Sequence, residues 1–321
     1  MWMLLCSCFV LDTKVDTPVD ASDTETVIVE VPSGSSARGL GPALLEEGLI
    51  HDDVSWRYYL KSRSAGSCLK AGKFELARSM TYPEIMETLC GVPMADEVPF
   101  TVVEGWRIRD IDEALAEDGW LVAGEYTAAA KDPARFDLPF EIDGLRSLEG
   151  FLMPETYNVP ESGFTAEELI QRQLDLFWRT WGQDAELGSR DLYEVVIVAS
   201  MLEREEPKPT NRPLVAGIIW KRLDEGWQLG IDATSRYTLE NWNDRKAFLR
   251  QLRDPGDAYN TRERKGLPPT PIGNPALPSL QAASAPVESD YYYYLHDGEG
   301  NLHPAVNAAE HERNRARYNV Y

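Results

Sequence analysis

The segment VIVASMLEREEP, residues 196–207, joins an apolar run directly to a cluster of charged residues. Its first acid, Glu203, follows Leu202 with no polar spacer. A carboxylic acid packed against apolar neighbours loses solvation of its charged form, so its pKa rises and it can deliver a proton near neutral pH. The negative end of a helix dipole acts in the same direction. We therefore identify Glu203 as a candidate general acid. The alternative is a solvated helix end, which suits Glu205 and Glu206 better than Glu203.

Other catalytic chemistries lack the residue patterns that they need. The sequence contains no G-x-S-x-G motif for a serine hydrolase and no glycine-rich phosphate loop. Its four histidines lack the H-E-x-x-H spacing of a zinc enzyme, and its four cysteines lack the paired spacing of a zinc site. We therefore expect no metal site, and carboxylates remain as the groups that could carry chemistry.

Composition limits the class of partner. The chain has 321 residues, of which 43% are hydrophobic and 10% aromatic, as in ordinary globular proteins. This length allows one sizeable core and a smaller module. The net charge of -21 argues against nucleic acid, because one polyanion repels another. Neutral sugars and mixed-charge polymers remain compatible with it.

The N-terminus and the cysteines bear on location. The stretch MWMLLCSCFVL is too short to span a bilayer and lacks the positive flank of an export signal. It fits an export anchor whose start is missing, a lipoprotein-like segment with Cys8 as acceptor, or a disordered cytoplasmic leader.

Cys68 and Cys90 could form a disulfide in an oxidising compartment, although buried thiols are the simpler expectation.

The pattern of apolar residues predicts a small α/β module followed by a more helical region. A polar linker, residues 12–26, precedes the module, whose strands and helices are expected at 26–32, 36–50, 69–77 and 81–91. This module ends near Val98 and has no acid-base cluster, so a binding or spacer role suits it. Beyond Phe100 we expect a strand, turn and helix in 100–120, helices in 165–181, 189–207 and 211–226, a Pro-rich loop and helix in 266–283, and a hairpin in 290–305. Ser189 or Asp191 should cap the central helix, and Gly226 should end the helix after it.

Three long blocks carry a resemblance to a known family. They are LEGFLMPETYNVP, the segment from VIVASMLEREEP to SRYTL, and the segment from YNTRERKGLPPTPIGNP to RARY. In order and spacing they resemble the endolytic murein transglycosylase family, also called YceG-like, from about Val27 to Tyr318. The resemblance implies an α+β protein: a truncated anchor and linker over 1–26, a small LysM-like α/β module over 27–98, and a mainly helical, lysozyme-like catalytic domain with a short antiparallel sheet over 99–321.

The resemblance also implies site residues. The family's Ala-Ser-apolar-apolar-Glu-x-Glu segment matches residues 199–205 and makes Glu203 the catalytic acid/base. The other blocks imply a set of substrate-binding residues: Glu149, Tyr157, Asp232, Thr234, Tyr237, Tyr259, Asn260 and Asn274. The alternative for the polar loop residues is turn chemistry that keeps a Pro-rich loop rigid. Ala233 stands where the family has proline, and Ser235 where an aliphatic residue is common, which puts the shape of the cleft in doubt.

The function implied by the resemblance is endolytic cleavage of the bond between N-acetylmuramic acid and N-acetylglucosamine in nascent glycan strands. The product ends are 1,6-anhydromuramyl groups, and cleavage would help to terminate strand elongation. One acid suffices, with no metal or organic cofactor. The implied location is the outer face of the cytoplasmic membrane, with peptidoglycan synthases as neighbouring partners. Two alternatives remain: a hydrolytic muramidase that uses Glu149 or Asp232 as a second carboxylate, and a noncatalytic peptidoglycan-binding scaffold.

Overall fold

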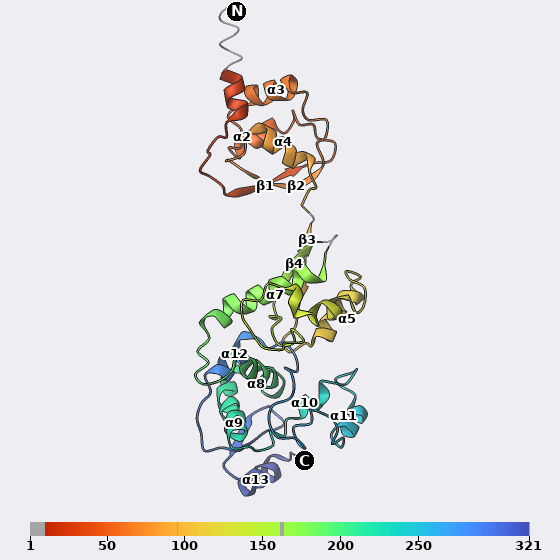
Figure 1. The fold of residues 1–321 in the computed structure, drawn as a ribbon, viewed down its shortest axis with the longest axis vertical. Coiled ribbons are helices and arrows are strands. Elements are labelled where there is room, and N and C mark those ends of the chain that lie inside the picture. The colour runs from red at the N-terminus through yellow and green to blue at the C-terminus, as the bar shows by residue number, and fades with distance from the viewer. Residues whose placement is uncertain (1–9, 95, 161–163, 321) are drawn as a thin grey trace, which may run out of the picture. The chain divides into compact units, whose positions relative to one another are not determined.

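The computed structural model describes residues 10–94, 96–160 and 164–320, and Figure 1 shows the course of the chain. Two compact units divide the chain, the first ending at Glu97 and the second beginning at Val98. Within the described ranges, no helix is both long enough and apolar enough to cross a membrane. Most of the stretch that suggested an anchor, residues 1–9, lies outside those ranges.

The first unit consists of a two-stranded antiparallel sheet and helices that share one hydrophobic core. Strands β1 (Thr26–Val31) and β2 (Gly72–Ala77) pair along their full length. In β1 the side chains of Val29 and Val31 are buried while those of Ile28 and Glu30 are exposed, as expected for a strand with one face on a core. The helices of this unit are α2 (Gly41–Glu46), α3 (Asp53–Ser62) and α4 (Tyr82–Cys90). The unit therefore runs strand, helix, helix, strand, with α4 added.

Two expectations for the first unit need correction. The helix expected over 36–50 is only the short α2, and α3 was not predicted. Its start is marked by Asp52, whose side chain accepts a hydrogen bond from the Ser55 backbone amide at 2.7 Å. Only Trp56 and Tyr59 among its apolar residues are buried, so the periodic signal is weak.

The polar segment before β1 is not a free linker. Residues 10–16 are helical, and Val15 is only 1% exposed because it belongs to the core of the first unit. Lys14 forms an ion pair with Asp52 at 2.6 Å. The expectation of a linker over 12–26 is therefore wrong for its first part.

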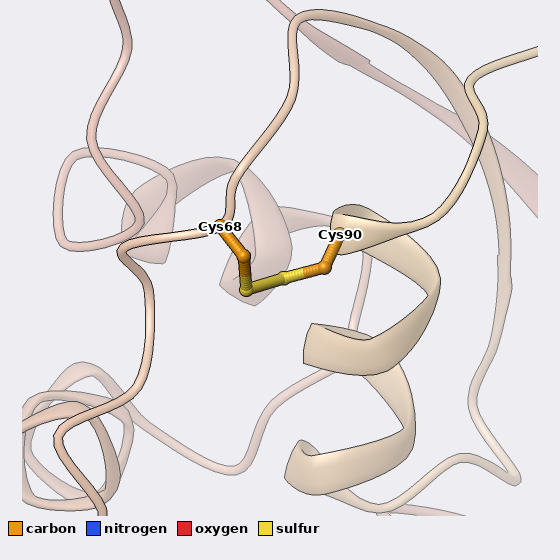
Figure 2. The surroundings of a disulfide bond; sticks show 2 residues. All are labelled: Cys68 and Cys90. Atoms are coloured by element: carbon orange, nitrogen blue, oxygen red, sulfur yellow. A yellow bond between two sulfur atoms is a disulfide. The ribbon is translucent and has the colours of Figure 1, made fainter.

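A disulfide joins Cys68 to Cys90, whose Cα atoms are 5.1 Å apart (Figure 2). It connects the loop after α3 to the last residue of α4, across 22 positions of sequence. The expectation of buried thiols is therefore wrong. Closing a loop of this length stabilises a fold mainly by restricting its unfolded chain.

The second unit is mainly helical, with two small sheets. Strand β3 (Glu97–Thr101) pairs with β4 (Thr156–Pro160), and β5 (Tyr293–His296) pairs antiparallel with β6 (Leu302–Ala305), as predicted for the hairpin. The helices are α5 (Ile108–Glu117), α6 (Glu125–Ala130), α7 (Ala166–Thr180), α8 (Leu192–Glu205), α9 (Arg212–Asp224), α10 (Asp232–Arg236), α11 (Arg245–Gln251), α12 (Leu277–Ser284) and α13 (Ala308–Tyr318), with short 3-10 turns at Pro133–Arg135, Gly182–Asp184 and Pro209–Asn211. The chain as a whole is α+β, as the resemblance implied.

Helix α8 runs through the core of the second unit. Asp191 caps it, accepting a hydrogen bond from the Tyr193 amide at 2.8 Å, which decides between the two predicted caps. Every residue from Val195 to Leu202 is buried, and the helix packs against α9 and α12. A continuous apolar run needs such cover on all sides. The polar residues that follow this run are therefore delivered to the edge of the core.

Candidate active site

The end of α8 directs its last three side chains to three different surroundings. Glu203 meets Arg212, the first residue of α9, with Nη2 to Oε1 at 2.9 Å and Nη1 to Oε2 at 3.3 Å. The backbone amide of Ala276 also donates to Glu203 Oε2, at 3.0 Å. Both charged side chains are only 7% exposed. Glu203 is thus enclosed by three donors, which differs from the apolar pocket expected from the sequence.

Arg204, the middle residue, points elsewhere. Its guanidinium lies 4.1 Å from the centre of the Trp242 ring and donates a hydrogen bond to the Gly105 carbonyl oxygen. Gly105 has a positive φ of 76°, and a Cβ there would come within 3.0 Å of the Arg204 Nε atom. This contact needs glycine, and it fixes the end of α8 against the segment before α5.

Glu205 lines a cleft of about 660 Å³. Its carboxylate accepts hydrogen bonds from the Tyr294 hydroxyl, at 3.3 Å from Oε2, and from the backbone amide of Ala233. Burial, and after it the negative charge of Asp232, raise the pKa of Glu205. An acid whose pKa is raised, at the wall of an open cleft, can donate a proton to a bound molecule. Glu205 therefore has the properties that the sequence assigned to Glu203.

Glu206 is also different from the solvated residue that was expected. Its side chain is buried, with Oε2 lying 2.8 Å from His296 Nε2 and Oε1 accepting from the Lys208 amide at 2.8 Å. Because His296 lies in β5, this pair connects the end of α8 to the hairpin. Tyr294, in the same strand, is thereby held beside Glu205.

Asp232 is the only predicted substrate-binding residue that lines the Glu205 cleft. It begins α10, and its Oδ1 lies 2.6 Å from the Arg262 guanidinium. Both side chains of this pair are about half exposed. The pair therefore offers one anionic and one cationic group at the wall of the cleft, within reach of solvent.

Glu149 lies in a second, smaller cavity of about 230 Å³ together with Tyr237 and Tyr259. The Tyr237 hydroxyl donates to Glu149 Oε2 at 3.0 Å, and the Ile108 amide donates to Oε1 at 3.1 Å. The rings of Tyr237 and Tyr259 are 4.9 Å apart. Burial raises the pKa of Glu149 to about 8. Glu149 and Asp232 therefore line different cavities.

The remaining predicted residues make contacts within the protein. Asn274 is buried, and its side chain accepts from the Gly150 amide at 2.8 Å and donates to the Trp106 carbonyl oxygen at 2.9 Å. Asn260 donates to the Leu252 carbonyl oxygen at 3.1 Å. Buried polar groups satisfied in this way stabilise loops.

Thr234 and Tyr157 follow the same pattern. The Thr234 hydroxyl donates to the Ile231 carbonyl oxygen at 2.7 Å, and the Tyr157 hydroxyl donates to the Met153 carbonyl oxygen at 2.6 Å. Both residues are buried, and neither lines the Glu205 cleft. Their contacts fit the turn chemistry weighed for the loop residues rather than direct contact with a substrate.

Sequence reasoning missed Glu205 and the residues of β5 that face it. Two residues along a helix correspond to about 200° of rotation, so Glu203 and Glu205 must point to nearly opposite sides. That rotation was a usable signal, but the side facing the cleft depends on α9 and β5, which are distant in sequence. The described residues contain no cluster of three or more His, Cys, Asp or Glu side chains that could hold a metal ion.

The fold and the site define a class: an α+β protein whose helical unit presents a protonatable acid in an open cleft. The model of the YceG-like family matches residues 29–317, so the chain belongs to the YceG-like family. It is 24% identical to an endolytic murein transglycosylase of Bacillus subtilis (strain 168), over 98% of this chain and 91% of that protein. It is 27% identical to an endolytic murein transglycosylase of Streptococcus pneumoniae (strain ATCC BAA-255 / R6), over 97% of this chain and 61% of that protein.

A solved structure shares the fold. The crystal structure of a YceG-like protein from Listeria monocytogenes matches with a TM-score of 0.58, over 90% of this chain and 99% of that one. The two sequences are 24% identical. The arrangement of strands and helices described above is therefore also found in a protein of known structure.

Proposed function

We propose that this protein is an endolytic murein transglycosylase, which cleaves the bond between N-acetylmuramic acid and N-acetylglucosamine within glycan strands. The observation that carries the proposal is Glu205, an acid with a raised pKa at the wall of a cleft that could hold sugars. The names of the relatives, which cover nearly the whole chain at 24% and 27% identity, support the same reaction.

Glu205 would act first as acid and then as base. As the bond between the muramyl anomeric carbon and the bridging oxygen breaks, Glu205 gives its proton to that oxygen. The resulting carboxylate then takes the proton of the muramyl 6-hydroxyl, whose oxygen forms the new bond to the anomeric carbon. The product is a 1,6-anhydromuramyl end, and no water is consumed. Because the nucleophile belongs to the same sugar, proximity supplies much of the rate.

Glu203 then has a positioning role in place of the acid role that the sequence assigned to it. Its ion pair with Arg212 and its hydrogen bond from Ala276 connect the end of α8 to α9 and to the segment before α12. Both oxygens of the Glu203 carboxylate are occupied by these donors, and Glu203 does not line the Glu205 cleft. Burial and the negative charge of Asp232, in contrast, raise the pKa of Glu205.

A hydrolytic muramidase is the second candidate, since Asp232 lines the same cleft as Glu205. Hydrolysis needs a second carboxylate to activate water or to attack the sugar. Asp232 is engaged with Arg262, and Glu149 lines the other cavity, so no free second carboxylate faces Glu205 from these two positions. The anhydro reaction is therefore the better fit.

The first unit would hold the enzyme on its substrate. Its strand, helix, helix, strand order supports a LysM-like, glycan-binding module, and the second unit supports a lysozyme-like catalytic domain. The disulfide fits an oxidising compartment such as the cell envelope. There, at the outer face of the cytoplasmic membrane, the protein would meet nascent strands and peptidoglycan synthases. Cleavage at that point would end strand elongation.

Product analysis tests the proposal. Purified protein is incubated with un-crosslinked glycan strands in heavy-oxygen water, and the new ends are identified by mass spectrometry. We expect 1,6-anhydromuramyl ends without the heavy isotope. Reducing ends that carry the isotope would establish the hydrolase. An intact substrate in the presence of folded protein would favour a binding scaffold.

A further inference from the structure

A row of aromatic rings leads out of the Glu205 cleft to the surface. It consists of His311, Tyr293, Tyr292 and Trp227, which we call the aromatic ledge. The rings of His311 and Tyr293 stack at 5.2 Å, and those of Trp227 and Tyr292 stack at 4.9 Å. Trp227 also meets Tyr293 edge to face, at 6.2 Å. The ledge is therefore a continuous series of ring contacts.

The inner end of the ledge belongs to the cleft. Tyr293 and His311 line the same cleft as Glu205, and so does Gln228, which directly follows Trp227. His311 comes from α13 and Tyr293 from β5, so two elements meet at this point. A strand that occupies the cleft and continues in this direction would meet Tyr292 and Trp227 next.

The outer end of the ledge is exposed. Trp227 has 38% of its surface accessible, which is unusual for the largest apolar side chain. Gly226, with a φ of 67°, ends α9, and the Trp227 amide donates to the Arg222 carbonyl oxygen at 2.7 Å. This turn places the indole ring beside β5. The chain thus fixes Trp227 at the surface instead of burying it.

Charged side chains hold the ledge in place. The Arg222 Nε atom donates to the Tyr292 carbonyl oxygen at 2.6 Å, and its guanidinium lies 5.3 Å from the centre of the Tyr293 ring. Lys221 Nζ lies 4.1 Å from the centre of the Tyr292 ring, whose hydroxyl donates to Glu225 at 2.8 Å. Rings held in this way lose little entropy when a ligand packs on them.

We propose that the aromatic ledge is a subsite for a sugar ring of the glycan strand, beyond the sugars at the cleaved bond. This inference rests on the proposed function, since it extends the cleft of the same enzyme. The C–H face of a pyranose ring is apolar and matches an exposed indole, while hydroxyl and acetamido groups at the ring edge can bond to Glu225 and Lys221. The shape suits a neutral, extended sugar chain.

The subsite makes binding depend on strand length. A short oligomer fills only the cleft around Glu205, whereas a longer one also reaches Trp227. Aromatic packing of this kind adds enough binding free energy for roughly a tenfold gain in affinity. An enzyme that gains affinity from distant sugars prefers the interior of long strands, which accords with endolytic cleavage.

Binding measurements on the full chain carrying Glu205→Gln test the ledge without turnover. Soluble N-acetylglucosamine oligomers, one short and one long, are titrated by calorimetry against this parent and three variants of it. The first unit is the same in all four proteins, so any binding by it is a constant background, and differences between the proteins report the second unit. Trp227→Ala should weaken binding of the long oligomer about tenfold and leave the short one unchanged. Trp227→Phe should keep most of the affinity. Leu249→Ala removes a comparably exposed apolar side chain on α11 and should change nothing.

Other results would overturn the subsite. The subsite would be refuted if the parent and Trp227→Ala bound the long oligomer equally well. It would also be refuted if Trp227→Ala lost affinity for both oligomers equally, or if the folded parent did not bind the long oligomer. A thermal unfolding curve for each variant shows whether a loss of binding is only a loss of fold. Because the assay needs no cleavage, a ledge that binds long oligomers in a protein making no anhydro ends would refute the proposed reaction and not the subsite.

Discussion

Glu149 and Glu205 are two acids of the second unit whose pKa values are raised by burial, yet their surroundings differ. Glu149 accepts from the Tyr237 hydroxyl, the Ile108 amide and the Asn274 side chain in a cavity of about 230 Å³. Glu205 accepts from the Tyr294 hydroxyl and the Ala233 amide, at the wall of a cleft of about 660 Å³. The comparison teaches that a raised pKa marks burial, while catalysis also needs room for a substrate beside the acid.

The largest effect should come from removing the acid at position 205. Glu205→Gln keeps the size and the hydrogen-bonding capacity of the side chain but cannot exchange a proton, so we expect kcat to fall about a thousandfold or more. The thermal unfolding temperature of Glu205→Gln should stay close to that of the unmodified protein. Steady-state rates on un-crosslinked strands measure the effect. A variant that retains most of its activity would remove Glu205 from the mechanism.

The next effect concerns the ion pair that encloses Glu203. Arg212→Met leaves Glu203 buried and unpaired, so we expect a loss of roughly 3–5 kcal/mol in the free energy of unfolding, measured with denaturant. Arg262→Met is the matched control, because it breaks the half-exposed pair with Asp232 and should cost about 1 kcal/mol or less. Similar losses for the two variants would show that burial does not distinguish these pairs.

A third effect is the contribution of Glu149 to the pH dependence of stability. Its folded pKa of about 8 lies above the value of an unfolded glutamate, so the folded state binds the extra proton and stability falls as pH rises toward 8. Between about pH 5 and 8 the loss should be roughly 3 kcal/mol.

Glu149→Gln imitates the protonated acid, so the part of the slope that Glu149 contributes should disappear in the variant, while Glu205, whose pKa is also raised, keeps its own contribution. Unfolding by denaturant at several pH values provides the measurement, and Glu141→Gln, at an exposed acid, serves as control. A slope as steep in Glu149→Gln as in the unmodified protein would assign it to another group.

The smallest effect concerns the first unit, which contains neither Glu149 nor Glu205. Replacing Cys68 and Cys90 by serine should lower the free energy of unfolding of that unit by about 2–3 kcal/mol. The reason is that the disulfide, which joins residues 22 positions apart, no longer restricts the unfolded chain. Limited proteolysis reports which unit opens first. Cleavage of strands by the second unit should change little. Faster proteolysis of the second unit than of the first would contradict this division.

The sequence predicts those features that depend on neighbouring residues. The unbroken apolar run of α8 required a buried helix, Gly226 ended α9 as expected, and the hairpin of β5 and β6 followed from its turn residues. Helix α3 escaped prediction because only Trp56 and Tyr59 among its apolar residues face the core.

The choice between Glu203 and Glu205 could not be made from local sequence. Glu203 is enclosed by Arg212 and by the Ala276 amide, nine and seventy-three positions away. Glu205 faces Tyr294, eighty-nine positions away. Both acids follow the same apolar run, and only the packing of α9 and β5 decides which one meets open space. The same packing places Glu149 and Asp232 in different cavities.

The most direct test compares the products of three proteins on the same un-crosslinked strands by mass spectrometry. The unmodified protein and a folded Glu203→Gln variant should both release 1,6-anhydromuramyl ends, and Glu205→Gln should release none. Anhydro ends from Glu205→Gln together with their loss in a folded Glu203→Gln would contradict the account and return the role of acid to Glu203.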